Sequence, residues 1–191
     1  MSFVLNKIKE SIAVKQALLE NDALLKQIEV AAEICITCLK NGGKVLFCGN
    51  GGSAADAQHL AAELSGRFYK DREPLFAEAL HVNTSYLTAV ANDYSYDEIF
   101  SRMIMSKGRK GDVLIGLSTS GNSKNIVLAF DEAHKRGLLN IALTGKTGGK
   151  MKTEADVLLN VPSTDTPRIQ ESHILIGHII CEIVENGIFP E

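Results

Sequence analysis

The sequence has no tryptophan, only four prolines and only four cysteines among its 191 residues. Four scattered cysteines with apolar neighbours do not suit a disulfide framework and indicate reduced, buried thiols. Cys35 and Cys38 have the spacing of a redox pair, but such a pair normally begins a helix that follows a strand. These two lie within one amphipathic segment instead. We therefore expect structural thiols.

The sequence also lacks long hydrophobic runs and runs of one charge. No apolar stretch reaches the roughly 18 residues of a membrane-spanning helix, and the N-terminus lacks the apolar core of a signal peptide. Lys and Arg (20) and Asp and Glu (23) are interspersed, with a net charge of −3, so no basic patch offers a surface to nucleic acid or to a membrane. We expect a cytoplasmic protein with a small-molecule partner, no nucleic-acid partner and no membrane partner.

The length and the 45% share of hydrophobic residues suit one domain with its own core. We predict a single domain over residues 1–191, with an N-terminal helical region at 1–41 and an α/β core at 42–191. Apolar residues recur every three or four positions in two helical patterns that meet near Asn21. Their apolar stripes exceed what one small core needs, which indicates packing between subunits.

Short apolar runs alternate with helical patterns from residue 45 onward. This alternation is typical of an α/β fold whose mostly parallel, five-stranded sheet is covered by helices on both faces and binds ligands at the carboxyl ends of its strands. The predicted strands cover residues 45–48, 75–80, 112–117, 139–143 and 157–161, and the later predicted helices cover residues 84–90, 96–107, 124–136 and 166–186.

The first strand runs into a glycine turn and then into an alanine-rich helix that begins near Ser53. Glycines let the backbone approach a ligand closely, and the free N–H groups of a helix N-terminus favour an anion. On the same helix His59 and Glu63 stand one turn apart, a pair suited to proton transfer. The pair could also be a solvated ion pair on an exposed face, although its small alanine neighbours leave room for a ligand.

Two nucleotide-binding motifs are matched only in part. Gly49, Gly51 and Ala54 have the spacing of a dinucleotide fingerprint, but no acidic residue ends the second strand to hold a ribose. The segment 145–147, Gly-Lys-Thr, resembles the end of a P-loop, yet Asn140 stands where the first glycine belongs. We reject the P-loop and regard the dinucleotide site as disfavoured.

A second turn, 118–123 (STSGNS), places several hydroxyls between an apolar strand and a helix. Such hydroxyls can hold phosphate oxygens without a cationic side chain, and the alternative is ordinary helix capping. Two such turns after apolar strands favour ligand binding. The last helix adds Gln170, Glu171, His173 and His178. Because Gln170 and His178 are roughly 12 Å apart along it, both must lean inward to contact one ligand, and His173 is expected to be structural or peripheral.

Six motifs together resemble those of the phosphoheptose isomerases, a family of sugar-isomerase (SIS) domain enzymes. The resemblance covers nearly the whole chain. The motifs are CGNGGSAADAQHLAAELSGR from Cys48, AND from Ala91, FSR from Phe100, GDVLIGLSTSGNS from Gly111, LTGKTGGKM from Leu143 and RIQESHILIGH from Arg168.

The resemblance implies a single SIS domain that converts sedoheptulose 7-phosphate to D-glycero-D-manno-heptose 7-phosphate through an enediol, with Glu63 and His178 as the catalytic residues. This would be the first step of heptose biosynthesis for lipopolysaccharide or capsule. The resemblance also implies zinc as a cofactor, bound by His59, Glu63, Gln170 and His178. The implied substrate-binding residues are Asn50, Gly51, Gly52, Ser53, Glu63, Asn92, Asp93, Ser118, Thr119, Ser120, Ser123 and Gln170.

The same resemblance implies a homotetramer with sites at subunit interfaces, in which the N-terminal helices take part. The sequence departs from the family at Pro167, where some members have an acidic residue, and Asp165 is the nearest acid here. An alternative is a non-catalytic SIS-domain tetramer that binds the bacterial replication initiator, a group to which the C-terminal segment 188–190 has a slight similarity. Such a binder does not need Glu63 and His178, so the isomerase is favoured.

Overall fold

The computed structural model describes residues 2–190 and contains one five-stranded sheet in which every neighbouring pair of strands is parallel. The strand order is β2-β1-β3-β4-β5. The predicted α/β fold is confirmed, with the edge strand β2 shorter than expected. The strands are β1 (Val45–Gly49), β2 (Ala77–Ala79), β3 (Val113–Ser118), β4 (Leu139–Thr144) and β5 (Val157–Asn160).

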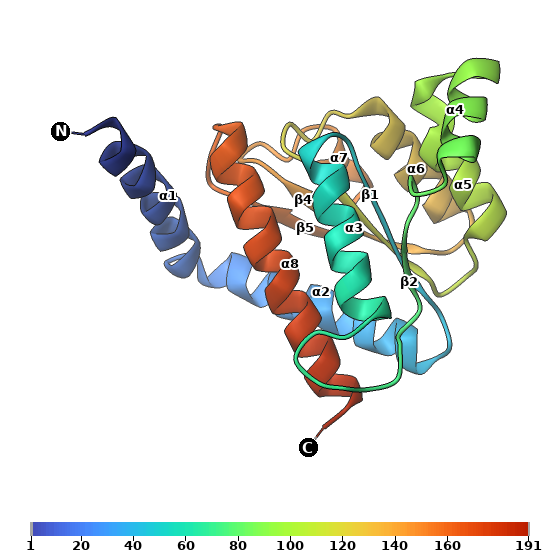
Figure 1. Cartoon of the computed structure of the whole chain (residues 1–191), viewed down its shortest axis with the longest axis horizontal. Helices are drawn as coiled ribbons and strands as arrows, with labels where there is room; N and C mark the ends of the chain where they lie inside the picture. Colours follow the sequence, from blue (N-terminus) through green and yellow to red (C-terminus); the bar gives the residue numbers. More distant parts are fainter. Residues whose placement is uncertain (1, 191) are drawn as a thin grey trace.

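Helices cover both faces of the sheet (Figure 1). One core lies between the sheet and α2, α3 and α8, and the other between the sheet and α4 to α7. Phe47 contributes to the first core and its neighbour Leu46 to the second, because successive strand residues point to opposite faces. The helices are α1 (Phe3–Leu19), α2 (Asp22–Lys40), α3 (Gly52–Ser65), α4 (Thr84–Asp93), the 3-10 helix η1 (Tyr96–Glu98), α5 (Ile99–Lys107), α6 (Lys124–Lys135), α7 (Met151–Glu154) and α8 (Thr166–Ile188).

The sheet has a switch point between β1 and β3. The helix after β1, α3, belongs to one face, whereas the helix after β3, α6, belongs to the other. In open parallel sheets ligands bind where the connections diverge in this way, at the carboxyl ends of the strands. The glycine turn after β1 and the serine-rich turn after β3 therefore meet at the expected place.

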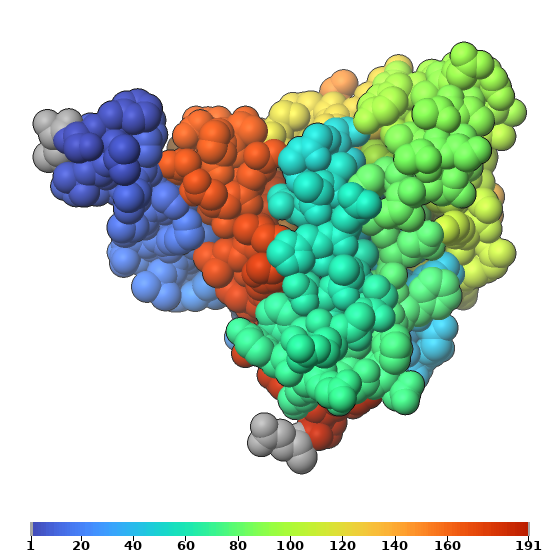
Figure 2. All heavy atoms as spheres, in the orientation of Figure 1, coloured from blue at the N-terminus to red at the C-terminus, as the bar shows by residue number. Residues whose placement is uncertain are grey.

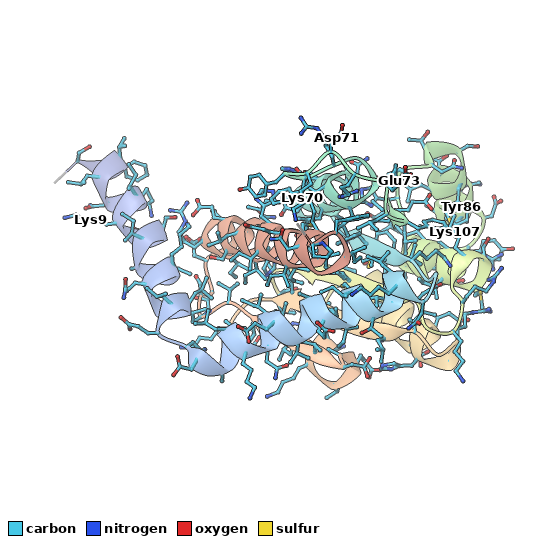
Figure 3. All side chains as sticks on the ribbon, turned by 90° about the horizontal axis from the view of Figure 1, so that it is seen from below. Lys9, Lys70, Asp71, Glu73, Tyr86 and Lys107 are labelled. Atoms are coloured by element: carbon cyan, nitrogen blue, oxygen red, sulfur yellow. The ribbon has the colours of Figure 1, made fainter. Side chains whose placement is uncertain are left out.

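The first helix projects from the body of the molecule, as Figure 3 shows at the end marked by Lys9. Its apolar residues Phe3, Ile8 and Ile12 are between 53% and 75% exposed. A groove of about 460 Å³ is lined by α1 and by Arg168 and Glu171 of α8, which also hydrogen-bond to α1, and it is visible as a notch between the dark blue and orange helices in Figure 2. Within residues 2–190 no helix has the length and apolar character needed to cross a membrane.

Candidate active site

The site is organised by α3 and α8, which lie side by side (Figure 1). Both follow parallel strands at the carboxyl edge of the sheet, so the two helices run in the same direction. Gly177 lets them approach closely, because a Cβ atom there would lie 2.5 Å from Cδ1 of Leu60. Residues in equivalent turns of the two helices therefore face each other along one seam.

Two histidines and a carboxylate meet on this seam. Nε2 of His59 lies 2.9 Å from Oε1 of Glu63 and 3.4 Å from Nε2 of His178. The two imidazole rings meet edge to face with their centroids 4.9 Å apart. The side chain of His59 is 49% exposed and that of Glu63 is 22% exposed. The predicted i,i+4 pair is thus joined by a third ionisable group from α8 at a place that solvent reaches.

Gln170 lies elsewhere on the same seam. A Cβ atom on Gly52 would be 2.7 Å from its Nε2, so the amide packs on the first residue of α3. Gly52 is seven residues before His59, or roughly 10 Å along the helix. The structure therefore brings together three of the four predicted metal ligands and places the fourth about two turns away. A ligand role for Gln170 stays a prediction.

The turns after β1 and β3 are linked by side-chain amides. Nδ2 of Asn50 donates to Oδ1 of Asn125 at 3.0 Å, and Nδ2 of Asn125 donates to Oδ1 of Asn50 at 2.9 Å. The hydroxyl of Tyr96 also donates to Oδ1 of Asn50, at 2.9 Å. Sequence reasoning missed both partners of Asn50, because they lie 46 and 75 residues away.

Hydroxyl groups gather at the carboxyl ends of β3 and β4. Oγ atoms of Ser118 and Ser123 lie 2.8 Å apart, and Ser118 is buried. Next to them a polar pocket of about 290 Å³ includes Lys146, so a cation is close to hydroxyls that we expected to act without one. The other residues that line the pocket are Thr119, Ser120, Asn122, Thr147, Ser163, Thr164, Thr166 and Ile169.

The remaining predicted substrate-binding residues lie at the rim. Asn92 and Asp93 end α4, where Nδ2 of Asn92 donates to Oδ1 of Asp93 at 2.9 Å. Both side chains are exposed. Gly51 precedes α3 with a φ of 56°, a conformation that favours glycine, and Ser53 is buried in the first turn. These residues stay candidates for substrate binding.

Asp56 is an ionisable residue of the seam that sequence reasoning did not select. It lies between Gly52 and His59 on α3, and its Oδ2 is buried without a hydrogen-bond partner among the described residues. Burial raises the pKa of this carboxyl, while His59 and His178 act in the opposite direction. Asp56 could have been found from its spacing, because residues 52, 56, 59 and 63 lie on one face of a helix.

A buried carboxylate fixes the loop that follows α3. Glu185 accepts hydrogen bonds from the backbone N–H groups of Phe68, Tyr69 and Lys70. Its Oε1 atom also forms an ion pair with Nε of Arg72 at 3.0 Å. Although burial opposes its ionisation, these donors lower the pKa of Glu185. The anchored loop places the Phe68 ring 5.7 Å from that of His178, so Glu185 supports one wall of the histidine cluster.

His173 has the structural place that we expected. It is fully buried, and its Nε2 donates to the carbonyl of Thr144 at 3.1 Å. Burial lowers its pKa to about 4. The four cysteines are likewise buried and free, and burial raises the pKa of Cys38 to about 11, so these thiols are not reactive.

The first comparison concerns the fold. A model of the SIS domain matches residues 8–145, which is well over half of the chain. The structure superposes on that of a phosphoheptose isomerase from Neisseria gonorrhoeae with a TM-score of 0.90 and 48% identity, covering 96% of this chain and 97% of the other. A second such structure, from Francisella tularensis, gives a TM-score of 0.92 at 39% identity and covers 96% of each chain. The architecture is that of an SIS domain.

Curated relatives extend the match to the full length. A phosphoheptose isomerase from Sulfurimonas denitrificans is 52% identical over 189 residues, which cover 99% of this chain and 97% of the relative. One from Clostridium acetobutylicum is 53% identical over 190 residues, covering 100% and 97%. The chain therefore belongs to the SIS domain family and, within it, to the phosphoheptose isomerases, a family of aldose–ketose isomerases.

Proposed function

We propose that the protein converts sedoheptulose 7-phosphate to D-glycero-D-manno-heptose 7-phosphate, the first step of a heptose biosynthesis that serves lipopolysaccharide or capsule. The observation that carries the proposal is the meeting of His178 with the His59–Glu63 pair. It occurs in a chain about half identical to phosphoheptose isomerases over its whole length. Family membership alone supports a heptose phosphate isomerase, and the side chains suggest how it works.

The proposed chemistry moves protons between two neighbouring carbons and their oxygens. Glu63 takes a proton from C1 of the ketose, which gives an enediol, and returns a proton to C2 to give the aldose. His178 exchanges a proton between the oxygens on C1 and C2, because an imidazole can both donate and accept a proton. No atom is gained or lost overall. The hydrogen bond that Nε2 of His59 donates to Oε1 of Glu63 orients the carboxylate for this work.

The same residues suit a zinc ion. The ligand atoms of His59, Glu63 and His178 lie within 4.8 Å of one another. Two ligands at about 2.1 Å from a tetrahedral ion are roughly 3.4 Å apart, close to the 2.9 and 3.4 Å separations here. We propose that these three, with Gln170, hold zinc, which when bound polarises the substrate carbonyl. Two imidazoles and one carboxylate are a donor set that catalytic zinc sites use.

We propose that the substrate extends from the histidine cluster to the polar turns. The phosphate would meet the hydroxyls of Ser118, Thr119, Ser120 and Ser123, near the positive charge of Lys146. The sugar would be held by Asn50, Gly51, Gly52, Ser53, Asn92, Asp93 and Gln170. Support comes from the position of both turns, which begin at the carboxyl ends of β1 and β3, on either side of the switch point.

We further propose a homotetramer that works in the cytoplasm. The exposed apolar residues of α1, together with Leu175 and Ile179 of α8, offer surface for subunit contacts. Four free cysteines are typical of a reducing compartment. The alternative, a non-catalytic partner of a replication initiator, does not account for a clustered carboxylate and two histidines.

The experiment is a direct assay of isomerisation. Purified protein is mixed with sedoheptulose 7-phosphate, with added zinc or with a chelator, and aldoheptose phosphate is followed by NMR. We expect product with zinc, less with chelator, and none from Glu63→Gln. The matched control is Glu73→Gln, which removes an equal charge from an exposed loop residue (Figure 3) and should retain full activity. No product from the zinc-supplemented wild type would instead favour the non-catalytic alternative.

A further inference from the structure

The side chain of Asn50 has its acceptor capacity fully used by the protein itself. Its Oδ1 atom has two lone pairs, and the structure directs one donor to each. The donors are Nδ2 of Asn125 and the hydroxyl of Tyr96, both at 2.9 Å. One of the two N–H bonds of the Asn50 amide is also used, at 3.0 Å to Oδ1 of Asn125. A single N–H bond is left.

We propose that Asn125 and Tyr96 are positioning residues that hold Asn50 as a one-directional hydrogen-bond donor to the sugar phosphate. With both lone pairs of Oδ1 occupied, Asn50 can offer a ligand only an N–H group, so its partner on the substrate is an acceptor oxygen. This inference rests on the proposed function, since it takes Asn50 as a substrate-binding residue. The inference adds Asn125 and Tyr96 to the site and specifies that Asn50 is the hydrogen-bond donor to the substrate.

The surroundings of the three residues support this role. Asn125 is 3% exposed and lies in the first turns of α6, so its amide is fixed by the core. Asn50 is half-buried and lies directly after β1, at the switch point. Tyr96 belongs to η1 and is largely exposed, and its hydroxyl closes the network from the solvent side. Its hydrogen bond therefore serves Asn50 and little else.

The first test is Tyr96→Phe, which removes one hydroxyl and keeps the ring. One lone pair of Asn50 becomes free, so the amide is no longer restricted to donating. We expect KM for sedoheptulose 7-phosphate to rise about three- to tenfold, the range that one hydrogen bond accounts for, with kcat within about twofold of wild type. A merely structural role would lower the amount of active protein and leave KM unchanged.

Tyr86→Phe is the matched control. The hydroxyl of Tyr86 donates to the carbonyl of Ile99 at 3.1 Å, on the α4–α5 side marked in Figure 3. The variant loses a tyrosine hydrogen bond of the same kind but none that involves Asn50. We expect a lower melting temperature with an unchanged KM.

The second test asks whether Tyr96 acts through Asn50. In a double-mutant cycle, Tyr96→Phe should have its three- to tenfold effect in the wild type and less than about a twofold effect in the Asn50→Ala background. A measurement that needs no Asn50 variant is the NMR signal of the Asn50 side-chain amide. Its free proton should shift when sedoheptulose 7-phosphate is added to the wild type, and should shift less in Tyr96→Phe.

Failure of this inference can be told apart from failure of the proposed function. The dissociation constant for sedoheptulose 7-phosphate is measured by calorimetry in the Glu63→Gln background, with and without Tyr96→Phe. Weaker binding with Tyr96→Phe supports the positioning role even if the wild type forms no product. Equal binding by the two proteins, an unchanged KM, or an undiminished effect of Tyr96→Phe in Asn50→Ala would each overturn it.

Discussion

The side-chain amide of Gln170 packs on the α-carbon of Gly52, where a Cβ atom would lie 2.7 Å from its Nε2. An added methyl group would meet the end of a flexible side chain, which can move away. At Gly49, three residues earlier, a Cβ atom would instead meet the backbone oxygen of Ser53 at 2.3 Å. Gly52 thus makes room for the functional side chain of Gln170, and Gly49 makes room for the backbone of the turn.

Gly52→Ala should therefore move Gln170 without unfolding the protein. We expect a melting temperature close to that of wild type and a zinc affinity reduced about as much as in Gln170→Ala. The double variant should bind zinc no more weakly than either single one, because both changes remove the same amide. Zinc calorimetry measures this. Unchanged zinc affinity in both single variants would exclude Gln170 from the ligand set. For comparison, Gly49→Ala should fail to fold, because its added methyl group would meet backbone atoms.

The parts of this molecule that follow from local pattern could be predicted. The strands β1 and β3 read as continuous apolar runs because every residue in them is buried from both faces of the sheet. The edge strand β2 is shorter than the apolar run 75–80 that predicted it, because only the three residues Ala77–Ala79 pair with β1. Likewise His59 and Glu63 were found because they lie one turn apart on one helix.

Partnerships across the fold could not be read in this way. Glu185 and Arg72 are 113 residues apart, and Tyr96 and Asn50 are 46 apart. Nothing in the spacing of such residues shows that they meet, since their contact depends on how whole helices pack. His178 was noted on the last helix as a possible ligand contact, but its catalytic role came only from the family resemblance. Packing of α8 on α3 gives the physical reason for its place.

The buried His173 should make stability depend on pH. Its pKa falls from an ordinary value of 6.5 to about 4 in the folded protein, so the unfolded chain binds the extra proton between these values. Stability is then fully present above pH 6.5 and is lost as the pH falls toward 4, by about 3 kcal/mol in all. In His173→Gln, which can still donate to the carbonyl of Thr144, this contribution should vanish.

Urea unfolding at several pH values between 4 and 7 measures the effect. The quantity to compare is the difference in unfolding free energy between wild type and His173→Gln, which should shrink as the pH falls. His134→Gln is the control, because His134 lies half exposed beside Asp156 and is not buried in the core. A constant difference between wild type and His173→Gln over this range would contradict the prediction.

Glu185→Gln should loosen the loop that walls the histidine cluster. Arg72, whose side chain is 3% exposed, would lose its partner, and an unpaired buried charge costs about 3 kcal/mol or more. Because the folded pKa of Glu185 is lowered, its contribution is present above its ordinary pKa of 4.5 and is lost as the pH falls through the lower folded value. Thermal unfolding and proteolysis of residues 66–76 should both report the loss.

The control is Glu182→Gln, one turn earlier on α8 and exposed to solvent. It should change the melting temperature little and leave the loop resistant to protease. If Glu185→Gln matched this control, the hydrogen bonds to Phe68, Tyr69 and Lys70 would contribute nothing to the order of the loop.

The apolar side of α1 should decide the oligomeric state. Ile8 and Ile12 are 53% and 59% exposed and border the groove between α1 and α8. Polar contacts join α1 to α8 but leave these two isoleucines in water, where a second copy of the chain could bury them. The double variant Ile8→Lys and Ile12→Lys places two charges in that contact. We expect light scattering to show a tetramer for the wild type and smaller species for the variant.

Met105→Lys provides the comparison, since Met105 is 48% exposed on α5, in the layer on the opposite face of the sheet. It should remain a tetramer, because exposure of a single apolar residue does not by itself mark an interface. A tetramer that survived both charges on α1 would show that the subunits meet elsewhere. A monomeric wild type would leave the exposed isoleucines of α1 in water and would refute the proposed tetramer.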